Sequence, residues 1–234
     1  LISEGAEIKG DQDPLGIKRL TTGLIEIIWD KKIEISIGKL VEKTLEVLGR
    51  KDDEIMKIII DFIIQRVENL LILEGIKPGL RRAVFSAIDD NLYEIRRKID
   101  AIKSVFVEGK GEEILIPFIR VANMLKQAEE RKIEYGDFRE DLLIEEAEKK
   151  LYKFYLENRL KMEKLYNEKK YKDFLEEMGR WKEPVDNFFN NVFVMVENEN
   201  IRENRLSLLK LIDNIFNKFA DFSYIPLKEV SNVK

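Results

Sequence analysis

Cysteine and histidine are both missing from this chain of 234 residues. Without cysteine there is no disulfide bond, no thiolate nucleophile and no cysteine ligand for zinc. Without histidine, the side chain that most often acts as a general base near neutral pH is absent as well. The absence of cysteine fits a reducing compartment, and we expect a cytoplasmic protein. We therefore expect no catalytic residue, no metal site and no cofactor site in this chain.

Long hydrophobic runs are missing too. No segment reaches the roughly 18 uninterrupted apolar residues of a membrane-spanning helix, and no signal-like apolar run stands near residue 1. These absences predict a soluble, intracellular protein without a membrane partner. Because residue 1 is leucine rather than an initiator methionine, we also expect the chain to begin inside a longer protein.

A strong net charge is the third feature that the chain lacks. Its 41 Lys and Arg residues stand against 45 Asp and Glu residues, which leaves a net charge of −4. The chain is therefore not a globally basic nucleic-acid binder, and any such binding requires a local basic patch. We expect no DNA partner.

What the sequence does contain is apolar residues at helical spacing, and they make up 44% of the chain. We expect helices to start near Asp13–Pro14, Ser36–Ile37 and Asp52–Asp53, where good N-cap residues stand. Gly49 is expected to end the second of these helices. Further helices are expected over 82–88, 92–107, 112–131, 140–166 and 171–181, with an entry loop over 1–12 and an extended linker over 33–37. No alternation of strands and helices appears, so the predicted class is all-α.

The stretch 184–222 shows the clearest pattern, two apolar helical faces separated by a polar turn. The first face holds Val185, Phe188, Phe189, Val192, Phe193 and Val196, and the second holds Leu206, Leu209, Ile212, Ile215, Phe216 and Phe219. Pro184 suits a first helical turn. The pattern predicts a tight helical hairpin connected by residues 197–200, with Phe188, Phe189, Phe216 and Phe219 in the core. Arg202, Asn204 and Arg205 lie just past its corner.

Two other motifs have plain structural interpretations. The acidic pairs Asp52–Asp53 and Asp89–Asp90 stand near expected helix starts, where carboxylates cap the backbone and favour the helix dipole. The sequence Gly109-Lys110-Gly111 lacks the further glycines, the Lys-Ser/Thr pair and the preceding strand of a phosphate-binding loop. We expect a helix–helix turn there.

Residues 149–182 form a local basic region, with eleven Lys or Arg against six Asp or Glu, a net charge of +5. Its aromatic residues are Tyr152, Phe154, Tyr155, Tyr166, Tyr171 and Trp181. RNA is bound by stacking of unpaired bases on aromatic rings and by contacts from Lys and Arg to phosphate. The alternative is that these rings belong to the core and the lysines are merely solvated, and the pattern alone favours this second interpretation.

Three segments resemble the β subunit of the bacterial two-subunit (α2β2) glycyl-tRNA synthetase. Residues 10–19 (GDQDPLGIKR) and 22–28 (TGLIEII) resemble that family's segment G-D-x-D-P-F/Y-A/S-L-R-R followed by G-I/V-I/L-R-I/L. Residues 118–125 (FIRVANML) resemble its K-R-V-x-N-I-L helix. Residues 185–206 and 220–223 are similar to its ending V-D-x-F-F-D-x-V-M-V-M, L-R-x-N-R-L and A-D-F/I-S.

The chain departs from these family patterns at several positions. Leu15, Gly16, Ile17 and Lys18 replace the usual aromatic, small, Leu and Arg residues, Asn190 replaces Asp, and Phe193 replaces Met. Most of these changes keep helix and core character. Lys18 in place of Arg weakens any inference of a bidentate contact there.

The resemblance implies a C-terminal fragment of the β subunit. Residues 1–98 are then the helical C-terminal part of an HD-like domain, and residues 99–234 are a helical-bundle anticodon-binding domain. The implied function is to bind the anticodon arm of tRNA(Gly) and to position it for glycylation, which the α subunit performs with ATP and Mg. An HD hydrolase site is not expected within this segment, because the segment has no histidine.

For RNA contact we expect Arg120, Asn123 and Lys126 on one helix, and Arg202, Asn204 and Arg205 at the hairpin corner. Arg would hold phosphate or base edges, and Asn would read base edges. Structural roles are equally open, since Arg205 can pair with Glu197 or Glu199 and Asn123 can bond to backbone. A further alternative for the whole chain is a helical scaffold that holds the αβ assembly together.

Overall fold

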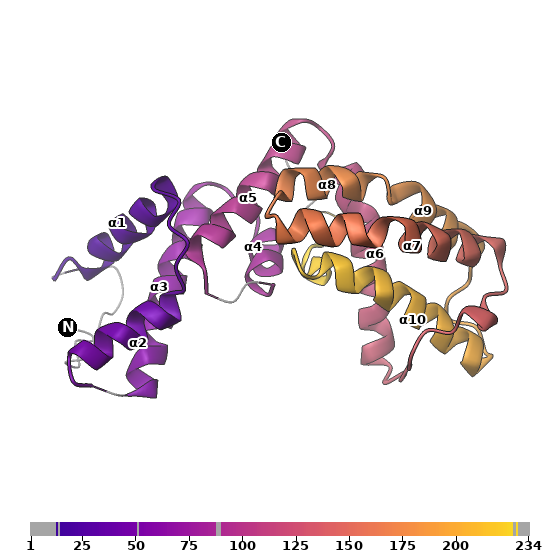
Figure 1. Ribbon diagram of the computed structural model, residues 1–234, viewed down its shortest axis with the longest axis horizontal. Helices are drawn as coiled ribbons and strands as arrows, with labels where there is room; N and C mark the ends of the chain where they lie inside the picture. Colours follow the sequence, from indigo (N-terminus) through magenta and orange to yellow (C-terminus); the bar gives the residue numbers. More distant parts are fainter. Residues whose placement is uncertain (1–12, 14, 51, 88–89, 227, 229–234) are drawn as a thin grey trace. The chain divides into compact units, whose positions relative to one another are not determined.

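The computed structural model describes residues 13, 15–50, 52–87, 90–226 and 228. The predicted entry loop 1–12 and Pro14 lie outside these residues. Within them the chain is all-α, as expected, and the only β-type pairing is one isolated antiparallel bridge between Ser36 and Asn91. Ten α-helices follow one another along the described chain (Figure 1). None of the helices in these ranges is long and apolar enough to cross a membrane.

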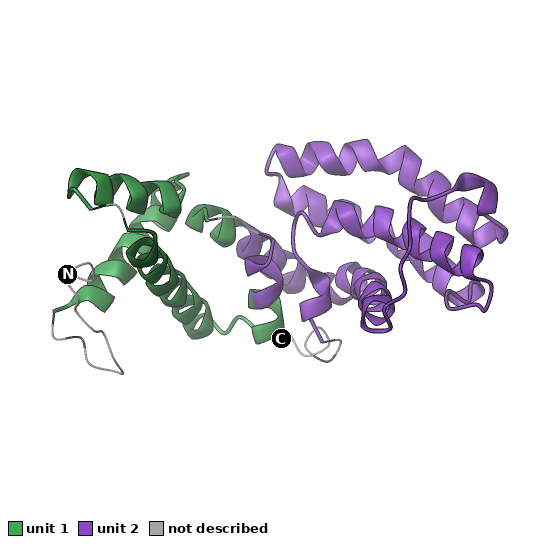
Figure 2. Cartoon of the chain, turned by 90° about the horizontal axis from the view of Figure 1, so that it is seen from below, with its two compact units in different colours: residues 1–81, 88–97 green, residues 82–87, 98–234 purple. Residues whose placement is uncertain are grey.

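The chain divides into two compact units (Figure 2). Unit 1 comprises residues 1–81 and 88–97, and unit 2 comprises residues 82–87 and 98–234. The helices α4 (Pro78–Phe85) and α5 (Leu92–Val107) each contribute residues to both units. The assignment of 1–98 to an HD-like domain and of 99–234 to a separate functional domain stays a prediction.

Unit 1 is built on the long helix α3 (Asp53–Leu73), against which α1 (Ile17–Asp30) and α2 (Ile37–Val47) both pack. Its helices start and end largely where local chemistry predicts. Ser36 accepts a hydrogen bond from the Lys39 N–H, and Asp52 accepts from the N–H groups of Glu54 and Ile55. Gly49 follows α2 with a φ of +69°, a conformation that glycine adopts at little cost.

The start of α1 differs from the prediction. The helix begins at Ile17, after Gly16 in the left-handed conformation with φ +68°. Asp13 still serves the helix, because its carboxylate accepts hydrogen bonds from the N–H groups of Lys18 (3.1 Å) and Arg19 (3.2 Å). The glycine bends the chain back so that a carboxylate four residues before the helix reaches its free N–H groups.

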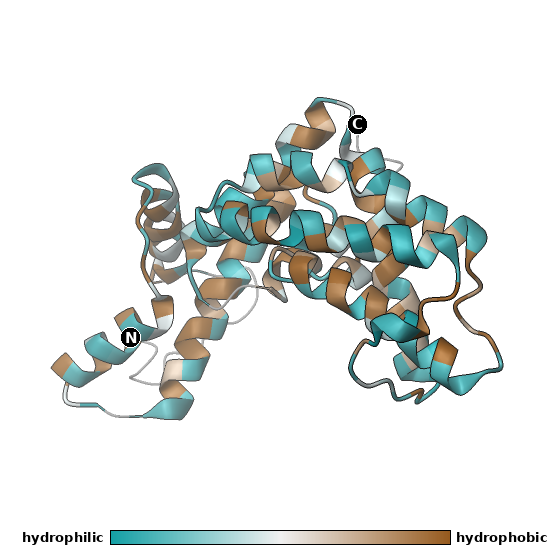
Figure 3. Ribbon diagram, turned by 45° about the vertical axis from the view of Figure 1, so that its right-hand side comes forward, coloured by the Kyte–Doolittle hydropathy of each residue, from teal (hydrophilic) through white to brown (hydrophobic). Residues whose placement is uncertain are grey.

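Unit 2 is organised around α6 (Gly111–Glu130), which packs against α8 (Tyr171–Gly179), α9 (Lys182–Asn191), α10 (Glu199–Phe216) and the short helix η3 (Phe222–Tyr224). The helix α7 (Glu146–Asn167) packs on α8, α9 and α10. Polar and apolar segments alternate along each of these ribbons, as amphipathic helices require (Figure 3). Pro117 is the seventh residue of α6, past the first turn where proline is best tolerated.

An aromatic cluster fills the core of unit 2. The rings of Phe118 and Trp181 lie 4.0 and 5.2 Å from that of Phe216, and Phe174 stacks on Phe219 at 5.6 Å. Phe216 and Phe219 are buried, as predicted, and so is Phe188. Aromatic pairs at these distances add roughly 0.5–1.5 kcal/mol each beyond the area they bury.

The predicted helix over 140–166 starts later than expected. The short helix η2 (Glu140–Leu142) comes first, and α7 begins only at Glu146. Glu145 and Glu148 form a capping box there, in which Glu148 accepts hydrogen bonds from the N–H groups of Ile144 and Glu145. Glu148 is itself buried, so this cap lies inside the unit.

The hairpin at 184–222 also departs from the predicted pattern. The helix α9 ends at Asn191, residues 192–198 form no helix, and α10 begins after Asn198, which caps it. Val192 and Val194 are buried, whereas Phe193 between them is 73% exposed. Val192 has an extended backbone and residues 194–195 form a turn, so Phe193 is wrong as a member of a helical face. Phe189 is half-buried rather than in the core.

Candidate nucleic-acid interface

The corner residues Asn204 and Arg205 lie in the interior of unit 2, where they hold two other segments against α10. The Asn204 side chain accepts a hydrogen bond from the backbone N–H of Arg139 at 2.7 Å. The Arg205 guanidinium pairs with the Glu148 carboxylate and donates to the Phe193 carbonyl at 2.9 Å. The two residues are only 4% and 6% exposed. Neither of the expected partners of Arg205, Glu197 or Glu199, is the one it binds.

Arg202 lies one turn earlier on α10 and is more open. Its side chain is 20% exposed and donates to the Val196 carbonyl at 3.2 Å, and an ion pair with the exposed Glu199 spans 3.8 Å. An exposed ion pair of this length contributes little stability. Arg202 therefore keeps charge available near the surface of the corner while it holds the end of the 192–198 segment.

The three predicted residues on α6 lie in different surroundings. The Arg120 guanidinium bonds to Asp186 at 2.9 Å and lies over the Phe189 ring, 4.7 Å from its centre. Asn123 is half-buried, and its side chain makes no hydrogen bond to the residues that the structure describes. Lys126 is exposed and lines a pocket at the other end of the helix.

Five of the six predicted residues thus divide among three places rather than forming one site. Arg120 belongs to the contact between α6 and α9, Lys126 to the pocket, and the α10 residues to the corner. Sequence spacing placed each set correctly on its helix. It gave no information on how far apart the two sets are.

A ladder of partly exposed rings lies on α7 and the segment before it. Phe138 contacts Tyr152 at 4.5 Å, and Tyr152 stacks on Tyr155 at 6.2 Å with only 15° between the planes. The Arg159 guanidinium continues the series 5.9 Å from the Tyr155 ring. All three rings are half-buried and Arg159 is exposed. We call Phe138, Tyr152, Tyr155 and Arg159 the α7 ladder.

The aromatic residues of the basic region divide between the two interpretations. Tyr171 and Trp181 are buried, and Phe154 packs edge-on against Trp181 at 5.1 Å. Tyr152 and Tyr155 instead keep part of their surface in solvent. Phe138 lies outside the basic region, and only its contact with Tyr152 identifies it as a member of the ladder.

Two exposed lysines of α7 stand on another face of the helix than the ladder. The side chains of Lys153 and Lys164 are 76% and 73% exposed, and their ion pairs to Glu157 and Glu168 are both 3.9 Å long. Since pairs of this kind contribute at most about 1 kcal/mol, an approaching phosphate can compete for the ammonium groups. In the α7 ladder itself, the exposed Arg159 guanidinium beside the Tyr155 ring combines a stacking surface with a cation, a combination that binds single-stranded RNA.

Metal chemistry has no obvious location in the described chain. No group of three or more acidic side chains that could hold an ion occurs among those residues.

The fold defines an all-α chain of two helical units. Comparison with known families agrees: residues 1–86 match the family model "Glycyl-tRNA synthetase beta subunit", and residues 114–222 match "DALR anticodon binding domain". The second match runs from the fourth residue of α6 to the first residue of η3.

Individual relatives extend this match along the chain. It is 35% identical over 220 residues to the glycine–tRNA ligase β subunit of Syntrophus aciditrophicus (strain SB), covering 92% of this chain and 31% of that protein. It is 32% identical over 242 residues to the β subunit of Persephonella marina, covering 96% of this chain and 33% of that protein. The chain thus spans about one third of the length of these relatives.

The chain belongs to the glycyl-tRNA synthetase β-subunit family. The resemblance to a C-terminal fragment of that subunit, inferred from the three motifs, is confirmed.

Proposed function

We propose that this chain is the tRNA-binding part of a glycyl-tRNA synthetase β subunit and that unit 2 binds the anticodon arm. The observation that carries the proposal is the match of residues 114–222, most of unit 2, to an anticodon-binding domain. The α7 ladder supports it independently, because its partly exposed rings offer a stacking surface and the exposed Arg159 beside them offers a phosphate contact.

The role of such a part in catalysis is positioning. The bound tRNA(Gly) presents its acceptor end to an α subunit, which forms glycyl-tRNA with ATP and Mg in an α2β2 assembly in the cytoplasm. Fixing the reactants relative to each other lowers the entropic part of the barrier without any chemistry in this chain.

We assign RNA contact to the α7 ladder, to Lys126 and to Arg202, all of which reach solvent. Arg120 and Asn123 stay proposed contacts of lower accessibility. Asn204 and Arg205 have no comparable exposure, and we assign them the supporting role of fixing the corner from which Arg202 acts.

The test is a titration of the 234-residue chain with tRNA(Gly) at about 50 and 200 mM salt. Salt weakens each contact between a lysine and a phosphate, so several such contacts predict a fall in affinity of at least tenfold between these salt concentrations. Tyr155→Ala should weaken binding by roughly fivefold or more, because a stacked base contributes about 1–3 kcal/mol. Tyr93→Ala, a change of the same kind in unit 1, is the control.

The second candidate function is a scaffold that holds the αβ assembly together. It is favoured by an apolar stripe on α1 in unit 1, where Leu20, Leu24 and Ile27 are 71%, 39% and 55% exposed at spacings of four and three. Side chains of this kind on one helix face commonly pack against a protein partner.

One pair of measurements separates the two functions. Retained capture of the α subunit without detectable tRNA binding favours the scaffold and refutes the RNA role. Tight tRNA binding that persists in Leu20→Ser/Ile27→Ser, with capture of α lost, assigns the two roles to different units.

A further inference from the structure

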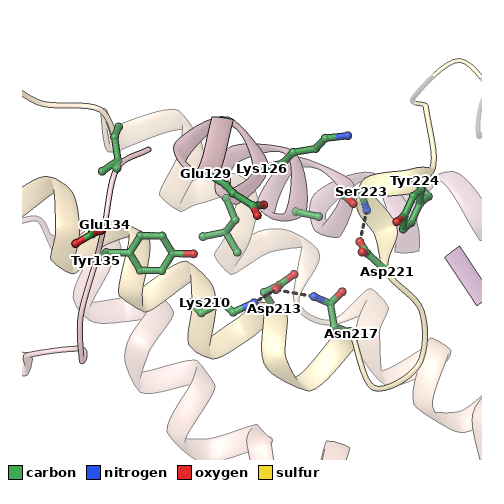
Figure 4. A pocket seen from close by; sticks show the side chains of 13 residues that line it. Lys126, Glu129, Glu134, Tyr135, Lys210, Asp213, Asn217, Asp221, Ser223 and Tyr224 are labelled. Atoms are coloured by element: carbon green, nitrogen blue, oxygen red, sulfur yellow. Dashed lines mark hydrogen bonds and ion pairs between the residues drawn. The ribbon is translucent and has the colours of Figure 1, made fainter. Parts of the chain in front are cut away.

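A pocket of about 780 Å³ opens in unit 2 between the C-terminal half of α6, the segment 133–135, the C-terminal half of α10 and η3 (Figure 4). Its volume falls in the range of small-ligand pockets, roughly 300–1,000 Å³. Of the residues predicted from sequence to touch RNA, Lys126 lines it. The charge, the hydrogen-bonding groups and the rings of the pocket determine which ligand it selects.

Charge excludes the simplest ligands. The lining carries two ammonium groups, of Lys126 and Lys210, and four carboxylates, of Glu129, Glu134, Asp213 and Asp221. A phosphate placed here is repelled by the carboxylates, and a compact cation meets the two ammonium groups. A neutral group that offers hydrogen-bond donors fits this mixture best.

The polar floor offers two acceptor atoms. The Lys210 ammonium and the Asn217 amide N–H both donate to Oδ2 of Asp213, at 2.9 and 2.6 Å. Oδ1 of Asp213 therefore has no donor among the described residues. Oδ1 of Asn217 is buried and has no donor in that part of the chain. In Figure 4 the side chains of Asp213, on α10, and Asn217, just past its end, lie next to each other and are joined by their own hydrogen bond.

A buried acceptor without a donor carries a desolvation cost that a bound ligand can remove. Asn217 Oδ1 is one such acceptor, and with Oδ1 of Asp213 beside it the floor favours a ligand edge with N–H groups over one with carbonyl oxygens. Burial also raises the pKa of the Asp213 carboxyl, with the Lys210 ammonium opposing this effect.

Two tyrosines flank this polar floor. Tyr135 lies at one end and Tyr224 at the other, and Tyr224 is 44% exposed (Figure 4). A tyrosine ring next to a polar recess is a stacking surface for a planar heterocycle. An alkyl amine has no flat face to use it.

We propose that this pocket takes one unstacked nucleobase that carries an exocyclic amino group, with Asp213 and Asn217 accepting from its N–H groups and a tyrosine stacking on its face. The inference rests on the proposed RNA-binding function and adds a base preference to it. Adenine, cytosine and guanine each present an amino group. Uracil has a single N–H between two carbonyls, and these carbonyls would face the oxygens of the floor.

The experiment measures anisotropy of labelled short oligoribonucleotides of cytidine, adenosine and uridine with the 234-residue chain. The wild-type chain should prefer the cytidine and adenosine oligomers to the uridine oligomer by on the order of tenfold. Asp213→Asn keeps the shape of the side chain but turns an acceptor into a donor, so the preference should fall to about threefold or less. Asp141→Asn, the same change at an exposed position outside the pocket, should leave the preference unchanged.

A stacking variant completes the design. Tyr224→Ala should weaken all three oligomers by a similar factor, since every base has a face to stack. Binding of tRNA(Gly) by the wild-type chain is measured in parallel. Tight tRNA binding without a preference among the oligomers, or with a preference that Asp213→Asn leaves intact, overturns the pocket assignment alone. Absence of tRNA binding overturns the proposed function and the pocket with it.

Discussion

The buried pair of Arg205 and Glu148 should make the stability of unit 2 depend on a side chain that sequence reasoning assigned to RNA contact. The two side chains are 7% and 1% exposed. Removing one partner of a buried pair leaves an unpaired charge and costs about 3–5 kcal/mol. Arg205→Ala also takes away the donor to the Phe193 carbonyl. We expect a loss near the upper half of that range.

Arg202→Ala provides a matched control, because the same change occurs one turn away on the same helix. Its ion pair to Glu199 is 3.8 Å long with a 79% exposed partner, and such pairs contribute about 0–1 kcal/mol. The hydrogen bond to the Val196 carbonyl adds roughly 0.5–1.5 kcal/mol. The two variants should therefore differ by at least about 1–2 kcal/mol in the free energy of unfolding.

The assay is urea denaturation followed by tryptophan fluorescence. The chain has two tryptophans, Trp29 in unit 1 and Trp181, fully buried in unit 2. In a Trp29→Phe background, Trp181 reports unit 2 alone. With a slope of about 1–3 kcal/mol per molar urea, a loss of about 4–5 kcal/mol should lower the Arg205→Ala midpoint by roughly 1.3–5 M.

A second substitution tests whether Arg205→Ala leaves an unpaired buried charge on Glu148. Glu148→Gln added to Arg205→Ala removes the orphaned charge and keeps an oxygen for the N–H groups of Ile144 and Glu145. The double variant should be more stable than Arg205→Ala by about 1 kcal/mol or more. A double variant less stable than either single one, or an Arg205→Ala midpoint equal to that of Arg202→Ala, would show that the pair does not carry a buried charge.

Three further outcomes follow from single contacts. Gly111→Ala should destabilise unit 2 by about 1–3 kcal/mol, because an added Cβ overlaps the Phe106 ring. At Gly23 an added Cβ meets nothing within 4 Å, so Gly23→Ala should have no such cost. Thermal unfolding compares the two variants. Lys98→Met should cost about 2–4 kcal/mol in urea denaturation, since the fully buried ammonium satisfies two backbone carbonyls, of Ala87 and Lys218. Asp213→Asn should be more stable than the wild type at pH 7, with the difference shrinking as pH falls towards ~3.9, the pKa of an unfolded aspartate. Desolvation raises the pKa of Asp213 more than the Lys210 ammonium lowers it, and the Asp221 charge raises it further. The folded chain therefore holds this proton to a higher pH than the unfolded chain does. The stability that the protonated Asp213 gives the wild type is lost as pH rises through the folded pKa. Urea titrations of both proteins at pH 4 and pH 7 measure it, and an equal difference at both values would contradict the raised pKa.

Helix starts were predictable where the signal is local. Ser36 and Asp52 cap α2 and α3 as expected, because a side chain that accepts from N–H groups two or three residues ahead requires no distant partner. Asp13 was identified as a cap, but the true start of α1 depends on the left-handed Gly16, which the spacing of apolar residues does not register.

The end of α9 was not predictable from the same spacing. Val192, Phe193 and Val196 continue the three-and-four pattern of the helix, but Val192 and Val194 equally satisfy the alternation of an extended strand. A distant contact accompanies the end of the helix. Arg205 on α10 donates to the Phe193 carbonyl, which in a continuing helix would accept from the backbone N–H four residues ahead. A contact between positions 193 and 205 cannot be seen before the fold is known.

The partner of Arg205 lies 57 residues away, in the cap of α7. A single sequence supplies candidates only nearby, and Glu197 and Glu199 were the natural ones. The buried pair changes the meaning of the motif Arg202-Glu203-Asn204-Arg205. Its two inward residues fix α7, the 139 segment and the 192–198 segment to one helix, and its outward residue, Arg202, remains at the surface. Because a hydrogen bond to the Val196 carbonyl already orders the partly exposed Arg202 side chain, a ligand that contacts it loses little side-chain entropy on binding, and this favours affinity.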